Sequence, residues 1–75
     1  MRPERVFGRT FEFANVENAQ AFFNLATKMT SAYSKFVDIT LIGTVVRVDI
    51  KVDSVGEEIY QALSTQLLAA ASNFA

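Results

Sequence analysis

The chain of 75 residues contains no cysteine, no histidine and no tryptophan, and it has one proline and three glycines. Without cysteine it can form neither a disulfide nor a thiolate metal site, which agrees with a reducing compartment. Without histidine it lacks the side chain whose ordinary pKa suits proton transfer near neutral pH. These absences exclude thiol redox chemistry and leave general acid–base catalysis without its usual group.

Charge of one sign is also lacking, because seven basic residues face eight acidic ones for a net charge of −1. No cluster of lysine and arginine forms the basic patch that nucleic-acid binding requires. The longest uncharged stretch, residues 59–75, contains too many polar residues to span a bilayer. No apolar segment follows the N-terminal arginines as it would in a secretory signal. We therefore expect a cytoplasmic protein with neither a nucleic-acid nor a membrane partner.

The composition is typical of a globular protein, since 51% of the residues are hydrophobic and 20% are charged. No internal repeat and no linker interrupts the chain, so residues 1–75 are predicted to form a single domain. A domain of this size buries only about 60% of the surface that its unfolded chain exposes. We therefore expect a homodimer, which adds buried surface and covers exposed sheet edges.

The first half of the chain predicts a strand followed by a helix. Phenylalanines alternate with polar residues over 6–13, which predicts a strand with a bulge at Gly8. Asn15 is suited to cap a helix N-terminus. Apolar residues at three- and four-residue spacing then predict a helix that ends near Tyr33. This apolar stripe comprises Val16, Ala19, Phe22, Phe23, Ala26, Met29 and Tyr33.

A hairpin follows, because residues 37–41 and 46–52 both alternate and Gly43–Thr44 between them allows a tight turn. In the second strand β-branched residues alternate with charged ones, so one face should be covered and the other exposed to water. The charged residues are Arg47, Asp49, Lys51 and Asp53.

The last element is predicted to be a helix that begins at a capping box. Ser54 and Glu57 have the Ser-x-x-Glu spacing in which each side chain bonds the other residue's backbone. A broad apolar stripe continues from Ile59 to Phe74. The whole order predicts an α+β fold, a two-layer βαββα sandwich with an antiparallel sheet and both helices on one face.

Three segments carry a likeness to a known family. The first segment is an alternating Phe-x-Phe followed by apolar residues spaced three apart in the helix. The second is a hairpin that begins with an Asp-Ile pair, and the third is the start of the last helix. They are Phe11, Phe13, Val16, Ala19 and Phe22; then Val37-Asp38-Ile39 with Val46, Val48 and Ile50; then Glu58-Ile59. In these segments the chain resembles the pterin-carbinolamine dehydratase family over some two thirds of its length.

The chain departs from this family where the family's chemistry lies. The family's paired histidines fall on Lys35 and Phe36, and its third histidine falls on Asp53. The family's helix glutamate falls on Ser31 and a pocket aromatic on Gly43. The resemblance therefore implies a non-enzymatic member with no catalytic residue, no cofactor and no metal. One alternative stays open, in which carboxylates such as Asp53 replace the histidines in a degenerate dehydratase.

Two surfaces are candidates for protein binding. The charged stripe Arg47, Asp49 and Lys51 is either the solvated side of a sheet or a recognition face for a partner. Phe36, in a loop, is an aromatic of the kind enriched at interfaces. Relatives in the family also pack their second helix against a symmetry mate, which implies an oligomer interface at Leu63, Leu67, Leu68, Ala71 and Phe74.

Among family members without the histidines, the chain is similar to a short protein encoded with α-carboxysome components that acts as a RuBisCO assembly factor. The resemblance implies a chaperone in carbon fixation, a carboxysome-associated location and the RuBisCO large subunit as partner. A second alternative follows the family's role as dimerisation cofactor of a homeodomain activator. In that case the outer face of the last helix, with Tyr60, Ser64, Thr65 and Gln66, would carry the binding.

Overall fold

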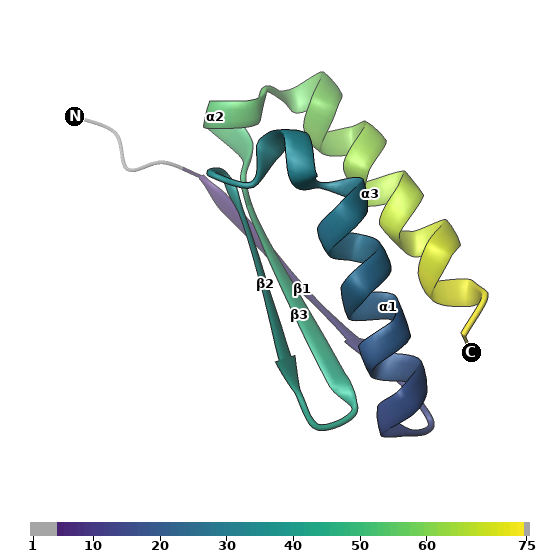
Figure 1. Ribbon diagram of the computed structural model, residues 1–75. Coiled ribbons are helices and arrows are strands. Elements are labelled where there is room, and N and C mark those ends of the chain that lie inside the picture. The colour runs from purple at the N-terminus through teal and green to yellow at the C-terminus, as the bar shows by residue number, and fades with distance from the viewer. Residues whose placement is uncertain (1–4, 75) are drawn as a thin grey trace.

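The computed structural model describes residues 5–74, which form a three-stranded sheet and three α-helices. The strand order is β1-β3-β2 and both neighbouring pairs are antiparallel. The predicted α+β class and antiparallel sheet are therefore confirmed, and Figure 1 shows the two long helices side by side along the sheet. The elements are β1 (Val6–Glu12), α1 (Val16–Met29), the 3₁₀ helix η1 (Ser31–Tyr33), β2 (Val37–Ile42), β3 (Val45–Lys51), α2 (Val52–Val55) and α3 (Glu57–Ser72).

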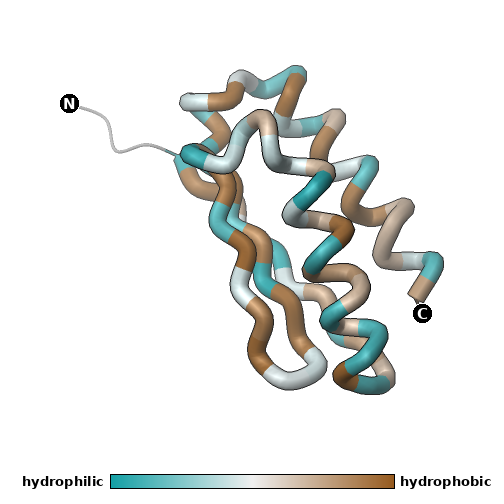
Figure 2. The backbone as a smooth tube through the Cα atoms, in the orientation of Figure 1, coloured by the Kyte–Doolittle hydropathy of each residue, from teal (hydrophilic) through white to brown (hydrophobic). Residues whose placement is uncertain are grey.

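The central strand β3 has one buried side, as its alternation predicts. Val46, Val48 and Ile50 are at most 3% exposed, whereas Arg47 between them is exposed. The same alternation of hydrophobic and hydrophilic residues follows the strands in Figure 2. The buried side of β3 belongs to one core with α1 and α3, which contribute Ala19, Phe22, Ala26, Leu63, Leu67 and Ala70. We call the opposite side of the sheet the open face.

Helix α1 begins where the sequence predicts and ends earlier. The Asn15 side chain accepts a hydrogen bond from the Asn18 backbone N–H at 2.8 Å, so the predicted N-cap is confirmed. The predicted end near Tyr33 is wrong, because the helix stops at Met29. The backbone N–H and the hydroxyl of Thr30 both donate to the Ala26 carbonyl, and the chain then continues as η1.

The predicted bulge at Gly8 is wrong. The pairing of β1 with β3 runs without interruption from Val6 opposite Lys51 to Glu12 opposite Val45. A Cβ atom at Gly8 would lie 2.6 Å from Asp49 Oδ1 and 3.1 Å from Arg47 Nη2. The absence of a side chain at Gly8 lets the ends of the Arg47 and Asp49 side chains lie over its backbone.

The predicted start of the last helix, with Ser54 as its N-cap, is also wrong. The chain leaves β3 directly into the short helix α2, and Ser54 lies inside that helix. The N-cap position of α3 is occupied by Gly56, whose φ of 91° is in the range that favours glycine. The Gly56 carbonyl accepts the Tyr60 N–H at 2.9 Å, so this glycine both ends α2 and starts α3.

Candidate functional site

The three positions onto which the sequence resemblance places the dehydratase histidines lie at one end of the sheet. Lys35 and Phe36 immediately precede β2, and Asp53 follows β3. Because β2 and β3 are antiparallel, the start of one strand lies beside the end of the other. The Lys51 N–H donates to the Phe36 carbonyl at 2.9 Å and fixes this arrangement. The predicted positions are therefore brought to one region, occupied here by a lysine, a phenylalanine and an aspartate.

Asp53 is engaged by Arg5, the first residue described. The Arg5 backbone N–H donates to one carboxylate oxygen of Asp53 at 3.0 Å, and its Nε donates to the other at 2.9 Å. The backbone bond first, and then the side-chain bond, lowers the pKa of Asp53 below its ordinary value. A general acid or base for neutral pH needs a pKa near the working pH. The hydrogen bonds from Arg5 lower the pKa of Asp53 and so make it less suited to acid–base catalysis at neutral pH.

The open face carries the predicted charged stripe. Asp49 lies between Gly8 of β1 and Asp38 of β2, and the next row places Arg47 between Thr10 and Thr40. The Arg47 Nε–H donates to both carboxylate oxygens of Asp49, at 3.2 and 3.1 Å, and the Arg47 side chain remains 58% exposed. Arg47 and Asp49 therefore form an ion pair on the surface, with the Asp38 carboxylate opposite Asp49 on the neighbouring strand.

Lys51 and Phe36 extend this stripe to the end of the sheet. Lys51 pairs with Val6 on one side, and on the other its backbone N–H donates to the Phe36 carbonyl. Val6 and Phe36 are both exposed hydrophobic residues. The structure thus brings together all four residues predicted for the partner face, Arg47, Asp49, Lys51 and Phe36, and adds Val6 to them.

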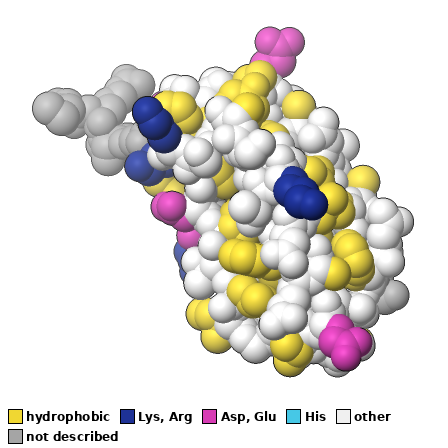
Figure 3. Space-filling model, viewed as in Figure 1, with side chains coloured by type: hydrophobic (Ala, Val, Ile, Leu, Met, Phe, Trp, Pro, Cys, Tyr) yellow, Lys and Arg dark blue, Asp and Glu magenta, His cyan; other side chains and the backbone are white. Residues whose placement is uncertain are grey.

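The helix side of the molecule differs from the open face. In Figure 3 hydrophobic atoms are scattered among neutral ones on this side, and few charged groups interrupt them. Among the residues predicted for an oligomer interface, Leu63 and Leu67 are buried in the chain's own core, so they offer no surface. Phe74 packs edge-on against the rings of Phe13 and Phe22 at 6.3 and 6.4 Å. Ala71 is half-buried against the same core, and Leu68 alone of the five remains exposed.

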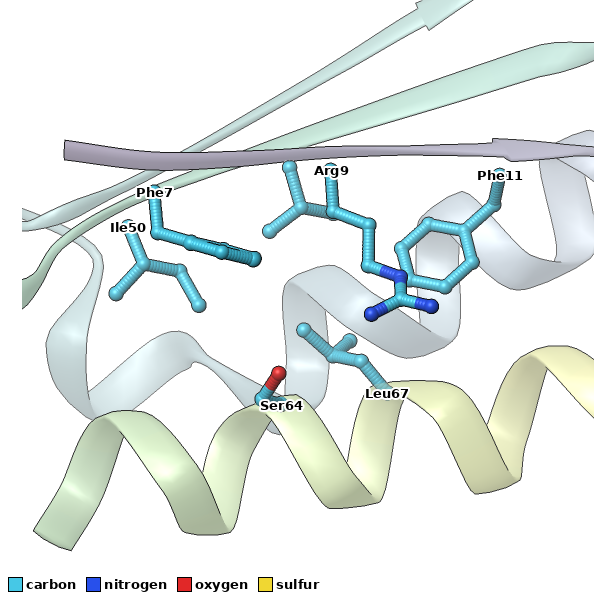
Figure 4. Close-up of a pocket in the computed structure, with 7 residues that line it drawn as sticks. Phe7, Arg9, Phe11, Ile50, Ser64 and Leu67 are labelled. Carbon is cyan, nitrogen blue, oxygen red and sulfur yellow. The ribbon is translucent and has the colours of Figure 1, made fainter.

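A pocket between β1 and α3 was missed in the sequence. It is lined by Phe7, Arg9, Phe11, Val48, Ile50, Ser64 and Leu67, and we call it the β1 pocket (Figure 4). The Arg9 guanidinium lies 5.7 Å from the centre of the Phe11 ring. The alternation of side chains along a strand could have indicated this pocket, because residues 7, 9 and 11 of a strand lie on the same face. Its cavity volume is about 10 Å³, which is about the room that one water molecule needs and far below the roughly 300 Å³ at which typical ligand sites begin.

In comparisons with known proteins, no protein-family model and no curated protein matches this chain. Within residues 5–74, no helix combines the length and apolarity needed to cross a membrane. The same residues contain no group of three or more acidic side chains arranged to hold a metal ion. The function is therefore inferred from the geometry of the described residues.

Proposed function

We propose that the chain is a non-enzymatic, pterin-dehydratase-like module that binds a protein partner through its open face. The partner proposed is the RuBisCO large subunit, and the role is that of an assembly factor in the cytoplasm, associated with the α-carboxysome. The observation that carries the proposal is the juxtaposition of Arg47, Asp49, Lys51 and Phe36 on an exposed side of the sheet. A mixed-charge surface flanked by exposed hydrophobic residues is suited to a protein partner.

We also propose the two-layer βαββα sandwich of the dehydratase type for the fold. The shared core supports this layering, because side chains from both long helices contact the same side of β3. The short α2 is an addition to the βαββα order. The homodimer remains part of the proposal, with the edge of β2 that has no strand neighbour within residues 5–74 as its candidate contact.

A degenerate dehydratase is less well supported. Its acid–base group would be Asp53, but Arg5 holds that carboxylate ionised and occupies both of its oxygens. The role as dimerisation cofactor is also less well supported, because a helical peptide docks on apolar anchors along a groove. On the outer face of α3, Thr65 and Gln66 are exposed and polar.

The test is recovery of soluble RuBisCO large subunit after dilution from denaturant in the presence of the protein. The variant Arg47→Glu/Lys51→Glu reverses both cations of the open face and should weaken capture by roughly tenfold or more. The control Lys28→Glu/Gln20→Glu/Gln61→Glu makes the same change in net charge on exposed residues of α1 and α3, away from the open face, and should capture like wild type. Equal capture by all three proteins would show that the open face is not the binding surface.

A further inference from the structure

The outer edge of β1 carries unpaired backbone groups. β1 ends the strand order, so within residues 5–74 it has one strand neighbour, β3. The Val52 N–H donates to the Arg5 carbonyl and the Phe13 N–H donates to the Thr44 carbonyl, each at 2.9 Å. Since antiparallel pairs alternate, the odd residues of β1 bond to β3. The N–H and C=O groups of Val6, Gly8, Thr10 and Glu12 therefore point to the free edge, where they can pair with an added strand.

The helix-facing side of this edge is apolar with one cation at its centre. Phe7 is 41% exposed and packs edge-on against Tyr60 at 5.2 Å. Along α3 the next residues on that flank are Ser64, which lines the β1 pocket, and Leu68, which is 40% exposed. Arg9 lies between these apolar groups and points from β1 toward α3 (Figure 4).

Arg9 has no acidic partner in the described part of the chain. The ion pairs among residues 5–74 join Arg5 to Asp53 and Arg47 to Asp49, and the only aromatic partner of Arg9 is Phe11. A guanidinium in an apolar setting attracts a carboxylate, which it binds with paired N–H donors. The charge at the centre of this edge therefore selects an acidic side chain.

A second copy of the chain is a poor occupant of this edge. In a two-fold antiparallel pairing that overlaps all of β1, residue 9 lies opposite residue 9 of the other copy, and Phe7 lies opposite Phe11. Like charges directly opposite each other on the same face destabilise strand pairing. Registers that separate the two arginines leave fewer residues paired.

We propose that the β1 edge binds an extended segment of another protein that has an acidic residue flanked by apolar residues two positions away on each side. The segment adds a fourth strand to the sheet. Its acidic side chain pairs with Arg9 and its apolar side chains lie beside Phe7 and Phe11, under Tyr60 and Leu68. The two residues between them face the open side, so their identity is unrestricted. This site lies on the other side of the sheet from the open face and does not depend on the proposed function.

The test uses two fluorescein-labelled peptides, Thr-Val-Thr-Glu-Thr-Val-Thr and the same peptide with lysine in place of glutamate. Fluorescence anisotropy should show that the wild type prefers the glutamate peptide, and that Arg9→Glu prefers the lysine peptide, each by roughly tenfold. Arg9→Gln should bind both peptides alike. Thr10→Pro removes an N–H that points to the free edge and should lose both peptides while its unfolding transition stays close to that of wild type.

Three results would overturn the proposal: equal binding of both peptides by the wild type, failure of Arg9→Glu to reverse the preference, or unchanged binding by a folded Thr10→Pro. If Thr10→Pro does not fold, the comparison of Arg9→Glu with Arg9→Gln decides. Light scattering on the same samples identifies a second copy at this edge. A dimer that Arg9→Glu or Thr10→Pro converts to monomer would also contradict the proposal.

Discussion

The two faces of β3 share one backbone, and side chains alternate between them, yet one face is buried in the core and the other is exposed. On the covered face, Val46, Val48 and Ile50 are almost completely buried among side chains of α1 and α3. On the open face, Arg47 and Asp49 contact chiefly each other, and Lys51 lies between exposed hydrophobic residues. The covered face therefore contributes to the free energy of folding, while the open face remains available for a partner.

The alternation of apolar and charged residues along a strand predicts which side is buried, but it does not predict the role of the exposed side. Burial follows from the pattern, because one side of the sheet must be removed from water for the chain to fold. The role of the other side does not follow from the pattern, since charged residues remain on the surface whether or not a partner uses them. Substitutions on neighbouring residues of β3 can separate these two contributions.

The largest effect is expected for Ile50→Ala, with Lys51→Ala as its matched control on the opposite face. Removing a buried isoleucine side chain should lower the free energy of unfolding by about 2–5 kcal/mol. That is a large part of the roughly 4–11 kcal/mol expected for a domain of 75 residues. Lys51→Ala should stay within about 0.5 kcal/mol of wild type. Urea unfolding measures both, and equal losses would show that the two faces contribute alike to stability.

A smaller effect is expected for Gly8→Ala. The added Cβ would meet Asp49 Oδ1 and Arg47 Nη2, which are the ends of flexible side chains and can move aside. Loss of an exposed ion pair costs about 0–1 kcal/mol, and alanine offsets it by restricting the unfolded chain. The free energy of unfolding in urea should therefore change by about 1 kcal/mol or less, while the signal of the Arg47 Nε–H shifts in nuclear magnetic resonance spectra. An unchanged Arg47 signal would mean that the pair does not lie over Gly8.

The smallest effect concerns the pH dependence of the Arg5–Asp53 pair. Because the pKa of Asp53 is lowered in the folded state, its contribution is complete above the ordinary carboxyl pKa of about 3.9 and is lost as the pH falls through the lower folded value. Asp53→Asn should therefore differ slightly from wild type in melting temperature at neutral pH and converge with it in acid. A difference that persists or grows below that range would contradict the lowered pKa.

Most of the fold could be predicted from local patterns. The alternation of β3, the turn at Gly43 and the Asn15 cap each depend on residues close together in the sequence, and the structure confirms them. The interruption between α2 and α3 could not be predicted in this way. The Ser54–Glu57 spacing favours a helix that starts at Ser54, whereas a glycine at 56 favours a break in the helix. In the structure Gly56 has a positive φ and is the N-cap of α3.

The site was predicted less completely, because its contacts join distant segments. Arg5 is far from Asp53 in the sequence, and nothing near either residue indicates their ion pair. The family resemblance placed Leu63 and Leu67 at an oligomer interface, but the core of this short chain buries both side chains. Arg9 is one of the polar residues that were predicted to alternate with the phenylalanines over 6–13, but it lies on the same face of β1 as Phe7 and Phe11. Because Arg9 is charged, the sequence did not indicate that it lies on the helix-facing side of β1.

The central claim is that the chain binds RuBisCO large subunit and catalyses no pterin dehydration. The most direct measurement is size-exclusion co-elution with large subunits caught during refolding, with turnover of a 4a-hydroxytetrahydropterin assayed on the same preparation. We predict co-elution without turnover. Turnover without co-elution, abolished in Asp53→Asn, would contradict the claim and show that a carboxylate has taken over from histidine.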